Sequence, residues 1–242
     1  MKRRQFLYRR PVLKISGEML AGEHSVGLDR QTFETIASQI VEVQRAGIKT
    51  SVVVGGGNIF RGGRNEFPEI SQVVADDMGM LATIVNALAL REYLAGLGCP
   101  ATVLSALEVP KIADRFTVRH ARHLLADGHI LIFAAGTGNP FFTTDTAAAL
   151  RAAELGADVL LKGTNVDGVY SDDPCRNRRA VKYTNLDYQT VLSKNLAVMD
   201  SCAVAICRNA RIPSVVFNLG QHGQLALALE GKPVGTVIGG GD

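Results

Sequence analysis

The sequence predicts an α/β protein whose mostly parallel sheet is covered by helices on both faces. Short apolar runs alternate along the chain with amphipathic segments of helical period, which is typical of repeated strand–helix units. Most of these runs do not alternate polar with apolar residues, as expected of parallel strands that are buried on both faces. Glycines, of which the chain has 25, often follow the runs directly and indicate loops that approach a ligand closely.

Seven apolar runs are the expected strands. They are 11–16 (PVLKIS), 50–54 (TSVVV), 101–105 (ATVLS), 129–135 (HILIFAA), 158–162 (DVLLK), 214–218 (SVVFN) and 235–239 (GTVIG). In a parallel sheet the carboxyl ends of the strands meet at one edge, where ligands of open α/β sheets bind. The loops KISGE, VVVGGGNIFRGG, FAAGTGNPFFTTD and LLKGTNVDGVYSDDP are therefore expected to converge on one site.

Helical patterns fill the stretches between these strands. The pattern over 29–46 has its apolar residues on one face, with Asp29 as a candidate N-cap and Gly47 past the end. A longer pattern over 71–95 recurs through Val74, Met78, Leu81, Val85 and Leu88. Further helices are expected at 117–126, 144–155, 187–195, 199–210 and 221–230. Because no linker or repeat separates these elements, we expect one domain over 11–242 after a basic arm at 1–10.

The composition is ordinary for a soluble globular protein, with 47% hydrophobic and 20% charged residues. The net charge of +3 is too small to indicate nucleic acid as the main partner, and its excess is local to 2–10 (KRRQFLYRR), which we expect to be a solvated arm. This start is too short in apolar residues for a secretory signal, and no membrane helix is expected elsewhere.

Cysteine and histidine spacing does not favour a metal site or disulfides. The 4 cysteines show no C-x-x-C spacing and are expected to be reduced thiols in the cytoplasm. His120 and His123 stand at i and i+3 of an expected helix, but no neighbouring acid or cysteine completes a ligand set. We therefore expect no metal bound by side chains alone.

Two familiar nucleotide-binding motifs do not fit the glycine-rich loops. The chain has no P-loop string G-x-x-x-x-G-K-[ST]. A dinucleotide motif G-x-G-x-x-G begins at Gly136 and Gly138, but Phe141 replaces the third glycine, which is needed for close packing of helix and strand. A dinucleotide site is therefore disfavoured.

Glycines and cations near the strand ends favour a phosphate site. Glycines 55–57 follow a strand directly, so their N–H groups can approach phosphate oxygens, and Arg61 adds a planar cation. Lys14 lies inside an apolar strand, where its charge must either reach the surface or meet an anion. The alternative for these loops is a set of flexible turns with surface cations.

The loop after Lys162 extends this prediction to a nucleoside triphosphate. It follows a buried strand and carries Tyr170, which fits the side of a base, and Asp173, which fits a ribose or base. The alternative is a turn-rich loop without a ligand.

Five segments in order carry a resemblance to a known family. LKISGE, GGGNIFRG, DMGMLAT, GTGNPFFTTD and KGTNVDGVYSDDP closely resemble the bacterial uridylate (UMP) kinases of the amino acid kinase superfamily, over the chain from about Pro11 onward. The resemblance implies a three-layer α/β/α sandwich that transfers the γ-phosphoryl of ATP, with Mg²⁺, to UMP in pyrimidine nucleotide (CTP and UTP) biosynthesis. It also implies a cytoplasmic homohexamer that GTP activates and UTP inhibits, without membrane or nucleic-acid partners.

The same resemblance implies roles for individual residues. The ATP contacts would be Lys14, Ile15, Ser16, Gly17, Gly57, Arg61, Thr164, Asn165, Tyr170 and Asp173. The UMP contacts would be Gly56, Asp76 (on the ribose), Thr137, Gly138, Asn139, Pro140, Phe141, Phe142, Thr143 and Thr144. The segment linked to GTP would be Gly22, Glu23, His24, Ser25, Val26 and Gly27, and the catalytic residues would be Lys14, Arg61, Asp145 and Lys162.

The expected mechanism is charge neutralisation between two anionic substrates. Lys14, Arg61 and Mg²⁺ would offset the repulsion between donor and acceptor phosphates, and Lys162 would add positive charge. The UMP phosphate is already deprotonated near neutral pH and needs no general base. Asp145 would either orient a lysine or a metal-bound water, or cap the helix that follows, and the sequence leaves both roles open.

Three other functions remain as alternatives. Another kinase of the superfamily would act on a carboxylate or carbamate, although NPFFTT fits the surroundings of a flat base better. A non-catalytic nucleotide-binding or storage protein is expected to lack the cations of the phosphate site, which are present here. A regulator that touches DNA is suggested only by the arm at 2–10.

Overall fold

The computed structural model describes residues 4–24, 26–61, 68–172, 176–177, 179–194, 196 and 198–239. Its strands are β1 Pro11–Ile15, β2 Ser51–Val54, β3 Ala101–Ser105, β4 Asp114–Arg115, β5 Ile130–Ala134, β6 Val159–Thr164, β7 Val169–Tyr170, β8 Lys182–Tyr183, β9 Asn185–Leu186, β10 Ser214–Asn218 and β11 Gly235–Ile238. The helices are α1 Gly17–Leu20, α2 Arg30–Arg45, α3 Gln72–Gly96, α4 Val118–Ala126, α5 Thr144–Leu155, α6 Tyr188–Ser193, α7 Ser201–Ala210 and α8 Gln224–Leu229.

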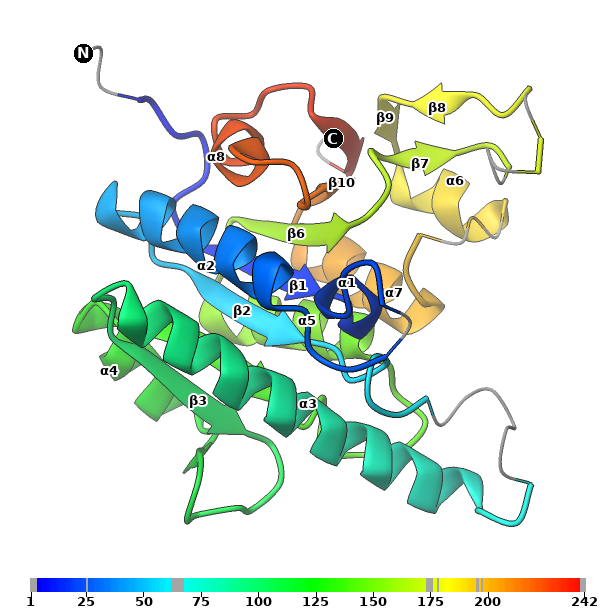
Figure 1. Cartoon of the computed structure of the whole chain (residues 1–242). Coiled ribbons are helices and arrows are strands. Elements are labelled where there is room, and N and C mark those ends of the chain that lie inside the picture. Colours follow the sequence, from blue (N-terminus) through cyan, green and yellow to red (C-terminus); the bar gives the residue numbers. More distant parts are fainter. Residues whose placement is uncertain are drawn as a thin grey trace.

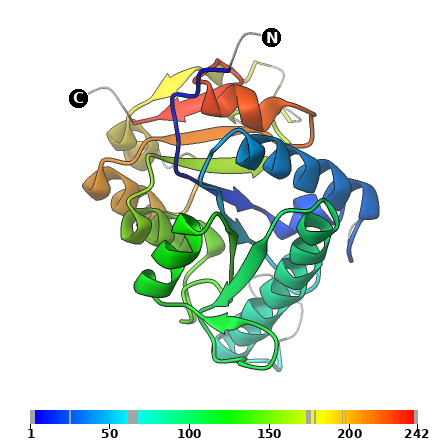
Figure 2. The same cartoon turned by 90° about the vertical axis from the view of Figure 1, so that its left-hand side faces the viewer.

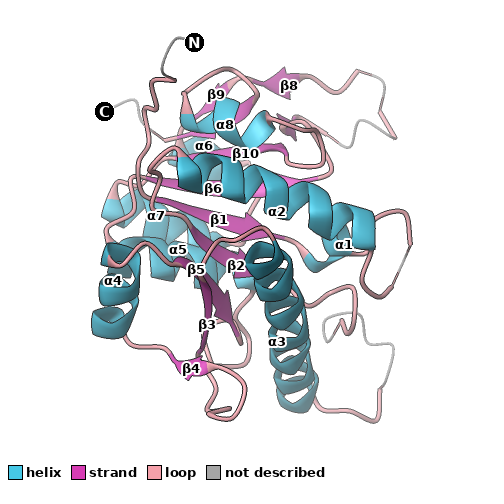
Figure 3. Ribbon diagram, turned by 60° about the vertical axis from the view of Figure 1, so that its left-hand side comes forward, coloured by secondary structure: helices cyan, strands magenta, loops and turns pink. Residues whose placement is uncertain are grey.

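The central sheet has nine strands in the order β4-β3-β5-β2-β1-β6-β10-β11-β9, while β7 and β8 form a separate hairpin. All neighbouring pairs of the central sheet are parallel except β10 and β11. Helices α2, α3 and α8 cover one face, and α4, α5 and α7 cover the other (Figures 1 and 3). The predicted mainly parallel sheet between two helical layers is confirmed.

Successive strand residues supply the two cores on either side of the sheet. Leu13 and Ile15 of β1 pack in the cluster that contains residues of α2, α3 and α8, whereas Val12 packs with residues of α5. Because side chains alternate across a strand, a strand between two helical layers must be apolar at every position. This is why all five residues of β1 are buried.

Local signals fixed most helix ends correctly. Asp29 is the N-cap of α2, and its Oδ1 accepts from the N–H of Thr32 at 2.8 Å. Gly47 follows the helix with φ 89°, a left-handed conformation that glycine adopts without strain. The short elements α1, β4, β7, β8 and β9 were not predicted, because two to four residues carry no measurable period.

The face that α3 presents to solvent differs from a simple amphipathic helix. Val74, Met78, Leu81 and Val85 of the predicted pattern are exposed, and Leu88 is half-buried. The buried side chains are instead Ala75, Met80, Ala82, Thr83, Ile84, Asn86, Ala87, Leu90 and Leu94. The helix is thus apolar on nearly all sides, so its period could not identify the inner face.

Helix α3 also corrects the expectation that no segment has the length of a membrane helix. By length and composition alone it could cross a membrane, and 44% of its most apolar window is buried inside the fold. A core helix of a soluble protein passes the same test. Its packing against α2, β3 and β5 accounts for the apolar residues on its buried side only.

Residues 4–10 lie against the fold and are not a freely solvated arm. Phe6 is buried, and the N–H groups of Leu7 and Tyr8 both donate to the carbonyl of Leu229 in α8, at 2.9 and 3.1 Å. The guanidinium of Arg4 pairs with Glu42 at 2.5 Å. Figure 2 shows this segment running past α8 to the start of β1.

Candidate active site

Two lysines on neighbouring strands meet one carboxylate at the edge of the sheet. Lys14 of β1 and Lys162 of β6 are register partners, so their side chains point to the same face. Asp145, in the first turn of α5, lies between them, with Oδ1 at 2.8 Å from Lys14 Nζ and Oδ2 at 2.6 Å from Lys162 Nζ. Lys162 Nζ also donates to the carbonyl of Val198.

Burial and charge act against one another in this cluster. Burial disfavours the ionised form of Asp145, but the charges of Lys14 and Lys162 outweigh it and hold its pKa below the ordinary value. For Lys162, burial and the like charge of Lys14 lower the pKa against the opposing charge of Asp145. Two lysines and one carboxylate leave the cluster with a net positive charge, which suits an anionic ligand.

The structure decides between the two expected roles of Asp145. Thr143 is the N-cap of α5, and its Oγ1 accepts from the N–H groups of Asp145 at 3.0 Å and Thr146 at 3.4 Å. The alternative in which Asp145 caps this helix is therefore wrong. Its carboxylate contacts the two lysines instead.

The loops after β1 and β2 touch each other over the cluster. A Cβ on Gly17 would lie 2.3 Å from the backbone nitrogen of Gly57, and one on Gly55 would lie 2.7 Å from that of Gly17. Only glycine permits this approach, which exposes backbone N–H groups to a ligand. Arg61 Nε donates to the carbonyl of Gly57 at 3.1 Å, and its guanidinium pairs with Glu18.

A cavity of about 460 Å³ opens above these groups. The expected phosphate-site residues meet in its lining, which is Lys14, Ser16, Gly17, Glu18, Gly55, Gly56, Gly57, Arg61, Thr144, Lys162, Thr164, Asn165 and Val166. Its volume fits a small-molecule ligand.

The segment 137–144 links β5 to α5 on one side of the cavity. Phe141 adopts φ 70°, which is uncommon for a residue other than glycine, and its side chain is 72% exposed. Its N–H donates to Asp76 Oδ2 at 2.8 Å, while Asp76 Oδ1 accepts from Gln72 at 2.8 Å. The structure thus brings Asp76 and this segment together, as a shared acceptor site requires.

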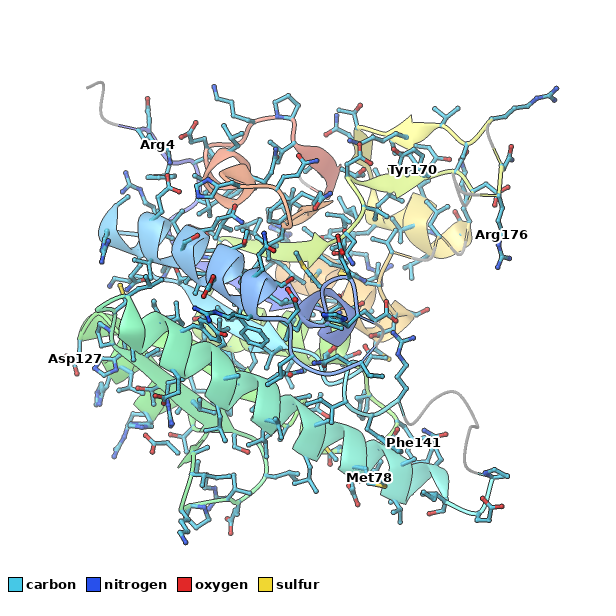
Figure 4. The ribbon with its side chains drawn as sticks, viewed as in Figure 1. Arg4, Met78, Asp127, Phe141, Tyr170 and Arg176 are labelled. Carbon is cyan, nitrogen blue, oxygen red and sulfur yellow. The ribbon has the colours of Figure 1, made fainter. Side chains whose placement is uncertain are left out.

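The expected nucleoside contacts lie on the other side. Thr164 and Asn165 line the cavity, while Tyr170 donates its hydroxyl to Asp167 at 2.8 Å. Figure 4 shows Tyr170 and Phe141 well apart, the first over β7 and the second beside α3 near Met78. Asp173 lies outside the described residues.

Comparison with known proteins agrees with this arrangement. The model of the amino acid kinase family matches residues 9–218. A uridylate kinase of Paramagnetospirillum magneticum is 48% identical over 231 residues, covering 96% of each chain. The chain belongs to the amino acid kinase family. The chloroplastic uridylate kinase PUMPKIN of Arabidopsis thaliana is 48% identical over 96% of this chain and 69% of its own.

The fold of the chain is similar to solved structures of UMP kinases. The crystal structure of the UMP kinase from Bacillus anthracis has a TM-score of 0.92 and 37% identity, covering 96% of each chain. That of the UMP kinase from Ureaplasma parvum has a TM-score of 0.90 and 37% identity, covering 96% of this chain and 99% of its own.

A second cavity has a volume of about 540 Å³ and borders residues 22–27, the segment expected to respond to GTP. Gly22, Glu23 and His24 line it together with Asp29. Asn165 lines both cavities, so the two are adjacent. Val26 is 69% exposed, Gly27 donates to the carbonyl of Asn58 at 2.9 Å, and Ser25 lies outside the described residues.

Sequence reasoning missed Asp200, which links segment 137–144, the expected acceptor segment, to α7. Asp200 caps α7 through the N–H of Ala203 at 2.9 Å and accepts from the hydroxyls of Thr143 and Thr146. An acidic residue before a helix signals only the cap. The contact with Thr143 arises because α5 and α7 pack side by side.

Proposed function

We propose that the chain is a UMP kinase that transfers the γ-phosphoryl of ATP to UMP, giving UDP and ADP. The observation that carries this proposal is the Lys14–Asp145–Lys162 cluster under the glycine loops, flanked on one side by segment 137–144. Such a site offers positive charge and backbone N–H groups to phosphates without a P-loop. The names of the similar proteins support UMP as the acceptor.

The proposed mechanism uses position and charge alone. Lys14 and Lys162 offset the repulsion between the phosphates, and Gly56 and Gly57 hold their oxygens by backbone N–H groups. The N–H of Gly55 donates instead to the carbonyl of Ile15 at 2.8 Å. Asp145 keeps both ammonium groups at the cavity floor. No residue needs to remove a proton, because the UMP phosphate is already ionised near neutral pH.

The ATP enters with its magnesium ion, which neutralises phosphate charge during transfer. No group of three or more His, Cys, Asp or Glu that could hold a metal occurs among the described residues. Both carboxylate oxygens of Asp145 lie within 2.8 Å of a lysine Nζ. The ion is therefore assigned to the substrate phosphates, and Asp145 to the lysines.

Two nucleotide positions follow from this proposal. UMP occupies the side of segment 137–144 with Gly56 and with Asp76 at the ribose, and ATP occupies the side of Thr164, Asn165, Tyr170 and Asp173. The ATP phosphates lie between these two sides, where they contact Arg61 and residues 14–17. The opposite placement of Phe141 and Tyr170 supports this order (Figure 4).

The proposal includes assembly into a homohexamer. Val74, Met78, Leu81 and Val85 form an exposed apolar stripe along α3 at helical spacing, and exposed patches of this kind mark protein interfaces. A second copy of the same helix face fits it, because homo-oligomers are commonly built on self-complementary surfaces. The hexameric number rests on the family resemblance.

The proposal also places the enzyme in the cytoplasm, in CTP and UTP biosynthesis, with GTP as activator at segment 22–27 and UTP as inhibitor. The cavity beside residues 22–24 supports a ligand there. The uninterrupted central sheet supports residues 11–242 as one kinase domain.

One coupled assay tests the activity. The protein is incubated with ATP, Mg²⁺ and a panel of nucleoside monophosphates, acetylglutamate and aspartate, with and without GTP or UTP. We expect ADP and UDP in equal amounts with UMP. Phosphorylation of acetylglutamate or aspartate but not UMP would replace this proposal by a carboxylate kinase, and nucleotide binding without any transfer would replace it by a storage protein.

A further inference from the structure

Two polar side chains interrupt the inner face of α3 beside the cavity. Thr83 is 3% exposed and Asn86 is 0% exposed, and they lie one turn apart on the same side of the helix. A buried hydroxyl or amide lowers stability unless it is hydrogen-bonded, so their partners indicate their role. Those partners belong to different loops of the site.

Thr83 holds the start of the acceptor segment. Its Oγ1 donates to the carbonyl of Met80 at 2.7 Å and accepts from the N–H of Ala135 at 2.6 Å. Ala135 is the first residue after β5 and has φ 60°, a conformation that costs free energy in a residue with a side chain. The bond from Thr83 therefore fixes the backbone where the chain turns into segment 137–144.

Asn86 is hydrogen-bonded to the glycine loop, which comprises residues 55–58. Its Nδ2 donates to the carbonyl of Gly55 and to Asn58 Oδ1, each at 2.7 Å. In return Asn58 Nδ2 donates to Asn86 Oδ1 at 3.1 Å and to the carbonyl of Gly27 at 2.7 Å. Asn58 is also 0% exposed, so the two amides form a closed, buried pair.

This pair permits only one arrangement. Turning either amide over would place N–H against N–H and oxygen against oxygen, and would leave a carbonyl of the loop without its donor. The glycine loop is therefore pinned to α3 through Gly55 and to segment 22–27 through Gly27. Gly56 lies against the same helix, since a Cβ there would be 2.7 Å from the carbonyl of Gly79.

We propose that Thr83 and Asn86 are positioning residues with different reach, Thr83 for the UMP segment alone and Asn86 for the loop that both substrates meet. Thr83 sets the backbone of segment 137–144, and Asn86, paired with Asn58, sets the loop that meets UMP through Gly56 and the ATP phosphates through Gly57. This inference rests on the two nucleotide positions proposed above. Because each side chain reaches a different loop, the effects of replacing them are separable.

The test replaces each side chain by an apolar one of similar shape, as Thr83→Val and Asn86→Leu. KM is measured for UMP and for ATP, and Kd is measured by calorimetry for UMP and for a non-hydrolysable ATP analogue. We expect Thr83→Val to raise the UMP constants at least about fivefold and to leave the ATP constants within about twofold. We expect Asn86→Leu to raise the ATP constants at least about fivefold and to raise the UMP constants as well, because Gly56 and Gly57 belong to the same loop.

Two controls separate positioning from loss of stability. Leu90→Ala removes a buried side chain from the same face of α3 without a bond to either loop, so it should lower Tm and leave all four constants unchanged. Thr83→Ser retains the hydroxyl and should restore the UMP constants. If Asn86→Leu does not fold, Asn86→Ser, whose side chain is too short to reach Gly55, takes its place.

Equal changes of the UMP and ATP constants in Thr83→Val, or constants that follow Tm as in Leu90→Ala, would overturn the inference. Unchanged constants in both variants would overturn it as well. Failure of the wild-type protein to form UDP would contradict the proposed function instead, and the calorimetric constants would still decide the positioning roles.

Discussion

Replacing Asp145 by Asn is the sharpest test of how the lysine cluster works. The substitution keeps the shape of the side chain but removes the negative charge that pairs with Lys14 at 2.8 Å and with Lys162 at 2.6 Å. At these distances and an effective dielectric constant of about 20, each attraction is about 6 kcal/mol before desolvation. Desolvation offsets most of this, and removing one partner of a buried ion pair typically costs about 3–5 kcal/mol.

We therefore expect Asp145→Asn to lower the free energy of unfolding by about 3–5 kcal/mol. We also expect kcat to fall at least about 100-fold, because the two ammonium groups repel each other and leave their positions. Urea denaturation gives the first quantity, and the coupled assay gives the second. Asp187→Asn serves as a control, because it makes the same charge change at the N-cap of α6, where Asn caps equally well.

The contribution of the Asp145 charge to the free energy of unfolding should depend on pH in one direction. The pKa of Asp145 is below its ordinary value in the folded protein, so its contribution is complete above an unfolded pKa of about 3.9 and is lost as pH falls through the lower, folded value. The difference in unfolding free energy between wild type and Asp145→Asn should stay constant from that pH up to neutral pH and shrink below it. A variant with wild-type kcat and wild-type stability at neutral pH would refute the electrostatic account.

Four further outcomes are expected. Gly17→Ala should raise the KM for ATP at least about tenfold, because its Cβ would meet the nitrogen of Gly57 at 2.3 Å; an unchanged KM would contradict the close approach of the two loops. Asp76→Asn should mainly raise the KM for UMP, since the carboxylate accepts from the N–H of Phe141, whereas a selective effect on ATP would reverse the order of the two sites. Leu81→Asp should give a smaller particle in light scattering with an unchanged circular dichroism spectrum, and an unchanged particle size would exclude the α3 stripe as an interface. Iodoacetamide at pH 8 should label Cys202, which is exposed, and spare Cys207, because burial raises the pKa of that thiol to about 11; peptide mapping that finds Cys207 labelled first would contradict this packing.

The local elements of the fold were predictable from the sequence to a large extent. Apolar runs such as 11–16 and 129–135 favour a strand covered on both faces, and Asp29 signals its helix by a bond within its own turn. Lys14, glycines 55–57 and residues 137–144 were predictable as parts of one site, because each lies at or just after the carboxyl end of such a strand.

The composition of the site beyond those loops depended on tertiary structure. Lys14 and Lys162 are neighbours only because β1 pairs with β6 in parallel register, and nothing local encodes that pairing. Asp145 was equally suited to cap a helix or to bind a lysine, and the cap at Thr143 decided the matter. Asp200 gave only a capping signal, since its contact with Thr143 requires α7 to lie beside α5.

Helix α3 shows both what the sequence determined and what only the tertiary structure decided. Its sequence by itself determined that a long helix forms, because apolar residues recur at helical spacing through 71–95. Only the tertiary structure decided which face is inside, because a helix that is apolar all round has no preferred direction of burial. The inner face proved to be the one that carries Thr83 and Asn86, whose buried side chains accept from Ala135 and donate to Gly55 in the loops of the site.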